Sequence, residues 1–318
     1  MATSDEMDIS LVHTTVQELA VTAKEPPPQY MVDEVLAADE MPKPIPLIDL
    51  SRLTTAADEA DKLRATLKTR GLFLATNHGI EESLMDVMMS ASRDFLRQPS
   101  EEKQKYNNLI VGKHFEMEGY GNDKVVTPQD QGLSWNDRLH LRVEPEDRGI
   151  SPSDPLTRNL SAKLLDLDED YFVNQISNKA SGFARFNYYP PCPRPDLVLG
   201  RRSHTDGGLL TILFVDQDVG GLQVERGGTW YNVPAKPYTL VINVADCMEI
   251  MTNGIFRSPL HRVVTNANKE RLSLARFYAV DAETVLEPAP SLLDDNRPPR
   301  YGKIKAKDFV SFSQLKSS

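Results

Sequence analysis

The feature that most constrains this fold is a series of short β-rich segments that starts near Gly182 and runs to about residue 280. They are FARFNYY, LLTILFV, LQVE, TWYNV, YTLVINV, HRVVT and RLSLARFYAV. Gly, Asp, Asn and Pro separate the segments, and no long helical pattern interrupts them. Closely spaced short strands with turn signals between them indicate a β-sandwich or barrel.

The first half of the chain has helical periodicity instead. Residues 56–70 place Ala56, Ala60, Leu63 and Leu67 on one helical face, which Gly71 closes. A second helix carries Leu84, Val87, Met88, Ala91 and Phe95 on one face, and a third begins at Ser100. IPLIDL and LFLAT between them predict short strands, and a short helical stretch is expected around Val16–Ala20.

Together these patterns predict an α+β protein with a double-stranded β-helix (jelly-roll) core, helices packed on its outside and a helical N-terminal region. We expect an extended N-terminal arm over 1–44, a mostly helical region over 45–175, the jelly roll over 176–285 and a C-terminal tail over 286–318.

Bulk properties exclude several classes of partner. The net charge of −10 and the pI of about 5.2 disfavour nucleic acids and anionic membranes. No apolar run approaches the roughly 18 residues of a membrane span, and the acidic N-terminus does not resemble a secretion signal. Cys192 and Cys247 are the only cysteines and are expected to be reduced. These features predict a soluble cytoplasmic protein and indicate nothing about its chemistry.

The segment His204-Thr205-Asp206 is the first candidate for chemistry. In an extended segment the side chains at i and i+2 project to the same face, so His204 and Asp206 can share one metal ion. His261 follows inside another strand-like segment, LHRVV. Two histidines and one carboxylate leave coordination positions open, which is typical of non-haem iron(II) oxygenases. Zinc is the alternative, although its helical His-x-x-x-His pattern is absent from the sequence.

Other histidines are weaker candidates. His114-Phe115-Glu116 fits the same short pattern, but its Gly-flanked surroundings favour a surface loop. His78, in NHGI, is interpreted as a core or turn histidine, and His13 and His140 have no partner pattern.

Strict alternation in the segment 271–277 places Arg271, Ser273, Ala275 and Phe277 on one face. Leu272 and Leu274 then face outward under helices, so Arg271 points into the barrel, where a cation is costly unless an anion meets it. A guanidinium suits a bidentate grip on a carboxylate. An internal Asp or Glu is the competing partner, but the position shortly after His261 favours a ligand.

Several longer motifs lie along the chain from about residue 45 to 285. They are NHGI (77–80), ARFNYYPPCPRPDLVLG (184–200), SHTDGGLLTIL (203–213), GGLQV (220–224), SPLHRVV (258–264) and RLSLARFY (271–278). Together these motifs, which cover most of that stretch, resemble one family, the plant 2-oxoglutarate/Fe(II)-dependent dioxygenases. The lead-in VQELA and PPPQYMV is similar to the specialised-metabolism branch, which includes senescence-related and alkaloid-demethylating members.

The resemblance implies a role for particular residues. Iron would be held by His204, Asp206 and His261. The distal carboxylate of 2-oxoglutarate would be held by Arg271, Ser273 and Tyr189, with help from Asn187. Phe277, Arg185 and Tyr120 match positions that approach the organic substrate, with ordinary aromatic packing or a surface salt bridge as the competing interpretations. Fe(II), 2-oxoglutarate and O2 are the implied cofactors, and stimulation by ascorbate is compatible with them.

The implied activity is oxidation of a small, largely apolar plant metabolite by hydroxylation, demethylation or desaturation, with succinate and CO2 as co-products. Two alternatives stay open from the sequence. One is an iron-dependent oxidase that does not use 2-oxoglutarate. The other is a non-catalytic jelly-roll protein that binds a ligand.

One segment departs from the family pattern. Relatives carry a long helix before a stretch like LDEDYF (167–172), whereas residues 150–166 offer only a short apolar pattern and lack a couple of dozen residues. Such a helix would cover an outer sheet face, so its loss exposes apolar surface. We expect lower stability than in relatives, or self-association through the surface that the shortened segment exposes.

Overall fold

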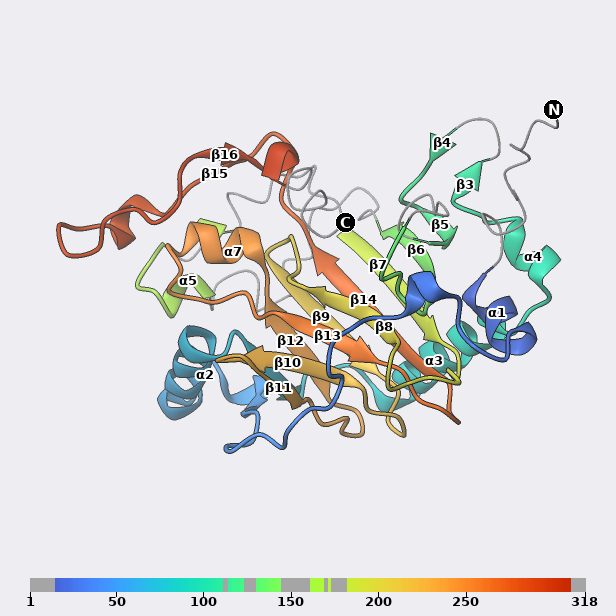
Figure 1. Cartoon of the computed structure of the whole chain (residues 1–318). Coiled ribbons are helices and arrows are strands. Elements are labelled where there is room, and N and C mark those ends of the chain that lie inside the picture. Colours follow the sequence, from blue (N-terminus) through green and yellow to red (C-terminus); the bar gives the residue numbers. More distant parts are fainter. Residues whose placement is uncertain are drawn as a thin grey trace, which may run out of the picture.

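The structure is a computed structural model that describes residues 15–110, 114–122, 130–143, 161–168, 171–172 and 182–309. Two β-sheets form the predicted jelly roll (Figure 1). The larger sheet has the order β1-β2-β12-β9-β14-β7-β6-β5, and the smaller has the order β11-β10-β13-β8. The strands of the larger sheet are β1 (Leu47–Asp49), β2 (Leu72–Thr76), β5 (Gly119–Gly121), β6 (Asp137–Val143), β7 (Gly182–Tyr189), β9 (Leu210–Val215), β12 (Leu240–Val244) and β14 (Arg271–Tyr278). Those of the smaller sheet are β8 (Leu199–His204), β10 (Leu222–Arg226), β11 (Thr229–Asn232) and β13 (His261–Val264).

Every β-rich segment predicted from alternation forms a strand, and β8 is a further strand that the pattern did not reveal. The two sheets bury a common apolar cluster between their inner faces. Leu74, Tyr189 and Val241 enter it from the larger sheet, and Val224 and Val263 from the smaller one. The inner face of each strand therefore points into a closed interior, where alternating positions can carry polar side chains for a ligand.

Helices cover the outer face of the larger sheet. Helix α2 (Ala57–Thr69) contacts β1 and β2, and α3 (Glu82–Leu96) contacts β14. Gly71 ends α2 as predicted: its φ is +66°, and a Cβ there would lie 1.8 Å from the Arg257 carbonyl oxygen. The other helices within the described residues are α1 (Val16–Thr22), α4 (Ser100–Gln104), α5 (Ser161–Lys163) and α7 (Asp246–Met251).

Helix α3 forms where the sequence predicts a helix, but the buried face differs from the predicted one. Met85 and Leu96 are buried, whereas Leu84 is 53% exposed and Val87 is 60% exposed. The apolar stripe is wider than the face that contacts the sheet, so part of it stays on the protein surface.

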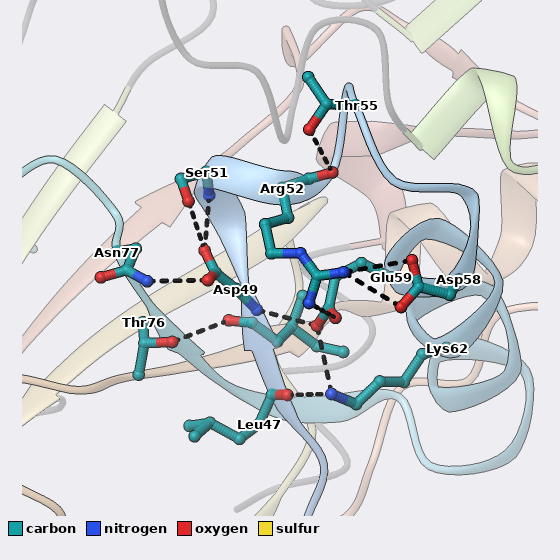
Figure 2. A network of polar contacts seen from close by, with 11 residues as sticks. Leu47, Asp49, Ser51, Arg52, Thr55, Asp58, Glu59, Lys62, Thr76 and Asn77 are labelled. Carbon is teal, nitrogen blue, oxygen red and sulfur yellow. Dashed lines mark hydrogen bonds and ion pairs between the residues drawn. The ribbon is translucent and has the colours of Figure 1, made fainter.

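A buried carboxylate joins β1 to α2 (Figure 2). The side chain of Glu59 accepts hydrogen bonds from the Asp49 backbone N–H (2.9 Å) and from Lys62 Nζ (3.2 Å). Arg52 lies 3.9 Å away as a second cation. Because Glu59 is only 4% exposed, these donors replace the water that its charge would otherwise require.

The arm over residues 15–44 is tied to both sheets. A capping box of Thr15 and Glu18 begins α1, and the carboxylate of Asp137 on β6 accepts from the first two helical N–H groups, those of Val16 and Gln17. Farther along, Glu34 pairs with buried Arg262 of β13 at 2.9 Å. The predicted extended arm is thus a packed part of the molecule.

The remaining elements are short. They are the 3₁₀ turns η2 (Pro28–Tyr30), η3 (Leu50–Arg52) and η5 (Pro290–Leu292), the pair β3 (Leu109–Ile110) and β4 (His114–Phe115), and the pair β15 (Val285–Leu286) and β16 (Ile304–Lys305). No helix within the described ranges is long and apolar enough to cross a membrane.

Most of the shortened segment, residues 150–160, and the predicted boundary at 175/176 lie outside the described residues. The described end of that segment packs on the core, because Ala162, Leu164 and Leu165 belong to the cluster under the outer helices.

Candidate functional site

His204, Asp206 and His261 meet at one end of the barrel interior. Strands β8 and β13 are antiparallel and pair His204 directly with His261. Asp206 follows β8 by two residues, and its Oδ1 lies 3.7 Å from Nε2 of each histidine. The three ligand atoms lie within 4.8 Å of one another, and this is the one cluster of metal-ligand type among the described residues.

Backbone carbonyls orient both imidazoles. His204 Nδ1 lies 2.8 Å from the Arg202 carbonyl oxygen, and His261 Nδ1 lies 3.0 Å from that of Pro259. A carbonyl only accepts, so Nδ1 carries the proton in each ring and the Nε2 lone pair faces the centre of the site. Asn243 Nδ2 donates to Asp206 Oδ2 at 2.7 Å and leaves Oδ1 toward the histidines.

The protonation of the cluster suits a metal ion. Burial, then the neighbouring His261 and Arg201, hold the pKa of His204 well below its usual value, so its ring is neutral at physiological pH. Asp206 and His261 are also buried. Two imidazoles and one carboxylate that converge in this way form the facial set that suits Fe(II).

Arg271 is buried on the inner face of β14, as strand alternation predicts. Its Nε and Nη1 atoms make no hydrogen bond, although the side chain is only 2% exposed. Its guanidinium carbon lies 5.1 Å from the ring centroid of Tyr189. Burial lowers the pKa of Arg271, and the nearby Tyr189 and Asp216 oppose that shift. Buried donors without acceptors fit an anionic ligand such as the distal carboxylate of 2-oxoglutarate.

A chain of hydrogen bonds links the other predicted residues. Arg185 Nε donates to Asn187 Oδ1 at 2.6 Å, and Asn187 Nδ2 donates to Ser273 Oγ at 3.3 Å. Ser273 and Asn187 are directly paired across β14 and β7, as are Ala275 and Arg185. The structure therefore brings Arg185, Asn187 and Ser273 together on the inner face, beside Arg271.

Two of the three residues expected to approach the organic substrate lie on the inner face, and one does not. Phe277 and Arg185 face inward on β14 and β7. Tyr120 lies on the outer face of β5, where it packs with Leu96 and Tyr188 and donates its hydroxyl to Gln17 Oε1. Strand register determines this, because Tyr120 pairs with Leu139, whose partner on β7 is the outward Phe186. The structure therefore separates Tyr120 from the site.

The other histidines that the structure describes lie in different surroundings. His78 is a turn histidine, as interpreted: its Nε2 lies 3.1 Å from the Tyr238 carbonyl oxygen. The stretch expected to be a loop at His114-Phe115 is instead strand β4, paired with β3. His140, which no sequence pattern singled out, faces the barrel interior next to Arg185.

Comparison with known proteins agrees with this geometry. Residues 181–280 match the model of the 2OG-Fe(II) oxygenase superfamily, and residues 45–162 match that of the non-haem dioxygenase in morphine synthesis N-terminal region. This chain belongs to the 2OG-Fe(II) oxygenase superfamily. It is a 2-oxoglutarate-dependent dioxygenase with a jelly-roll core, and Fe(II) and 2-oxoglutarate are its cofactors.

Two relatives and one solved structure align with this oxygenase over about nine tenths of their own length. Protein SRG1 of Arabidopsis thaliana is 34% identical, with 94% of this chain and 90% of the relative covered. Codeine O-demethylase of Papaver somniferum is 33% identical, with 93% and 90% covered. The crystal structure of JOX2 in complex with 2OG, Fe and JA has a TM-score of 0.83 at 29% identity, with 95% and 93% covered.

The alignment with protein SRG1 also measures a length difference. The alignment extends over 329 positions, whereas this oxygenase has 318 residues. Only 94% of those 318 residues are included in the alignment. The relative therefore has a residue at about 30 positions where this chain has none. This number of unmatched positions is close to the couple of dozen residues that the sequence pattern predicts to be missing before Leu167.

Proposed function

We propose that this oxygenase binds Fe(II) through His204, Asp206 and His261 and oxidises a small, largely apolar plant metabolite by hydroxylation, demethylation or desaturation. The convergence of three ligand atoms within 4.8 Å, each fixed by a hydrogen bond on its far side, carries the proposal. Arg271 and Ser273, with Tyr189 and Asn187, would hold the distal carboxylate of 2-oxoglutarate.

When bound, iron and 2-oxoglutarate supply the oxidant, with O2 consumed and succinate and CO2 released. The residues of the chain have positioning tasks. The carbonyls behind the two histidines fix their rings, and Asn243 fixes Asp206, so that the three side chains would present their ligand atoms to one ion. Phe277 and the apolar residues around it would keep water from the substrate carbon. Ascorbate would act by keeping the iron reduced.

We place this activity in the jelly-roll region 176–285, with 45–175 as its helical cover, and in the cytoplasm. Cys192 and Cys247 are both free and buried, which fits a reducing compartment.

The test is anaerobic loading with Fe(II) and 2-oxoglutarate, followed by plant metabolite extract and O2. We expect one or more metabolites to gain one oxygen or to lose a methyl group or a hydrogen pair, with one succinate formed per turnover. Product without succinate would instead support an iron oxidase that does not use 2-oxoglutarate. Tight binding of a metabolite that never reacts would support the non-catalytic ligand-binding alternative.

We also propose that this oxygenase self-associates through an apolar groove on the outer face of the larger sheet, the kind of face that a longer helix before Leu167 is expected to cover. The groove has a volume of about 240 Å³. Its lining includes Ile80, Leu84 and Met88 on the side of α3, and Ile212, Leu240 and Leu274 on the side of the sheet. Leu84 and Val87 project from α3 beside it.

A second copy of the same chain is the occupant that this surface favours. The same patch offers both protruding side chains and a groove, which is what a two-fold interface requires. Charge is complementary as well: α3 has exposed Glu81 and Glu82 at its start and Arg97, 59% exposed, at its end. Two α3 helices packed antiparallel would place each acidic end against the basic end of the partner.

We expect wild-type protein to sediment as a dimer and Leu84→Glu to sediment as a monomer. Burying a leucine contributes roughly 1.5–3 kcal/mol, and a charge in its place weakens association by at least about tenfold. Val35→Glu is the matched control, because Val35 is 80% exposed and lies on the N-terminal arm. Sedimentation velocity across a hundredfold range of concentration is the measurement. A wild-type monomer at every concentration would contradict the proposal.

A further inference from the structure

Three side chains on the inner face of the larger sheet hold buried polar atoms that make no hydrogen bond. They are Arg271 (Nε and Nη1), His140 (Nδ1) and Thr211 (Oγ1). Buried polar atoms in native proteins nearly always have a partner, so an atom without one inside the barrel calls for an explanation, and a bound ligand is one. For Arg271 that ligand is 2-oxoglutarate under the proposed function. His140 lies elsewhere on the face and needs a different ligand.

Strand register gives the position of His140. Ala275, Arg185 and His140 form one row across β14, β7 and β6, and Phe277, Phe183 and Arg142 form the next row. The His140 ring stacks on Phe183, with centroids 5.0 Å apart and planes inclined at 28°. His140 therefore sits beside Arg185, at the edge of an aromatic wall that Phe183 and Phe277 provide.

Arg185 connects this position to the metal site. It is buried, and its charge acts on both Asp206 and His204. A molecule that reaches from His140 past Arg185 therefore extends toward the open side of the metal cluster. This is the path that an organic substrate would follow, with its head at His140 and its reacting carbon near the iron.

The charges around His140 indicate the head group. Burial, then Arg138 and Arg185, lower the pKa of His140 to about 3, so the imidazole is neutral at physiological pH. A neutral ring offers one N–H donor, and the nearby guanidinium groups make the surroundings favourable for negative charge. A carboxylate accepts the N–H and gains from both cations. A hydroxyl or an ester accepts the N–H but carries no charge for the cations to stabilise.

We infer that His140 and Arg185 form the head-group site of the organic substrate, and that this substrate is a carboxylic acid with an apolar body. The inference rests on the proposed function, because it takes the barrel interior as the substrate chamber. His140, which no sequence motif singled out, becomes a substrate-binding residue. The expected substrate class becomes apolar carboxylic acids, a subset of the largely apolar metabolites proposed above.

The test uses a panel of aryl- and cycloalkyl-alkanoic acids, each paired with its methyl ester and its alcohol. Protein is loaded anaerobically with Fe(II) and 2-oxoglutarate, and binding of each probe is followed through the visible charge-transfer band of that complex. We expect the best acid to bind about tenfold to a hundredfold more tightly than its ester or alcohol, because only the acid forms charge-assisted hydrogen bonds.

Two variants isolate His140. His140→Phe keeps a ring on Phe183 but has no donor, so it should lose the preference for acids and keep the affinity for esters. His140→Asn places an N–H near the position of Nδ1 and should restore part of the preference. The affinity for 2-oxoglutarate should be unchanged in both, and neither variant should melt at a lower temperature than wild type, which separates the head-group role from a structural one.

The possible failures are distinguishable. A normal charge-transfer band with no acid bound better than its ester overturns this inference and leaves the proposed function intact. A preference for acids that survives in His140→Phe assigns the head group to other residues and also overturns it. Absence of the band overturns the proposed function, and the inference with it.

Discussion

Asp206→Ala is expected to lower iron affinity by more than about a hundredfold and to remove substrate-dependent succinate formation. Loss of a residue that only orients a ligand costs about 10–100-fold in metal affinity, and loss of the ligand itself costs more. Asp206 is the only carboxylate of the cluster, so its removal leaves two imidazoles and no negative charge to offset the ion. Equilibrium dialysis of Fe(II) and a succinate assay measure the two effects.

Asp218→Ala is the matched control, because Asp218 is exposed and its carboxylate lies outside the cluster. It should behave as wild type in both assays. Asn243→Ala should fall between the two variants, since it removes only the 2.7 Å hydrogen bond that holds Asp206 Oδ2. Iron binding at wild-type strength in Asp206→Ala would contradict the assignment of this cluster.

Strand alternation predicted the inner face of β14 because polar and apolar side chains alternate at the start of this strand. Arg271 and Ser273 lie inside, and Leu272 lies outside. Strand β8 was not predicted, because LGRRSH has two arginines and little apolar alternation. Its place comes from pairing with β13, a non-local contact that the local sequence does not encode.

For Tyr120 and His140, the sequence did not predict which face of the sheet each side chain occupies. The family resemblance suggested Tyr120 as a substrate contact, but the pairing of β5 with β6 turns it to the outer face. No pattern singled out His140, yet the register of β6 against β7 places it beside Arg185 on the inner face. In both cases the side of the sheet depends on register, and a shift of one residue would reverse it.

Helix α3 illustrates a different limit. Its apolar periodicity predicted a helix, but periodicity cannot tell which apolar side chains have a neighbour to pack against. Met85 faces the sheet, whereas Leu84 and Val87 remain on the surface.

Arg271→Leu is expected to weaken 2-oxoglutarate binding by at least about a hundredfold and to stabilise the ligand-free protein. Charge-assisted hydrogen bonds contribute roughly 1.5–3 kcal/mol each, and the unpartnered Nε and Nη1 of Arg271 are donors that an anionic ligand can use. Without the ligand, the same buried nitrogens are a cost, so an apolar side chain of similar reach should raise the free energy of unfolding.

The two effects of Arg271→Leu have opposite signs, and this makes the prediction specific. A ligand that binds only the folded state stabilises it by RT ln(1 + L/Kd), where L is the free ligand concentration, so the rise in melting temperature grows with the logarithm of the affinity. Wild-type protein should therefore start at a lower melting temperature and rise when 2-oxoglutarate is added, whereas Arg271→Leu should start higher and stay constant. Arg276→Leu is the control from the outer face of the same strand, and it should keep the response to 2-oxoglutarate. If Arg271→Leu responded to 2-oxoglutarate as wild type does, another group would hold the co-substrate. Loss of the buried cation that binds its carboxylate would otherwise lower the affinity and reduce the rise in melting temperature.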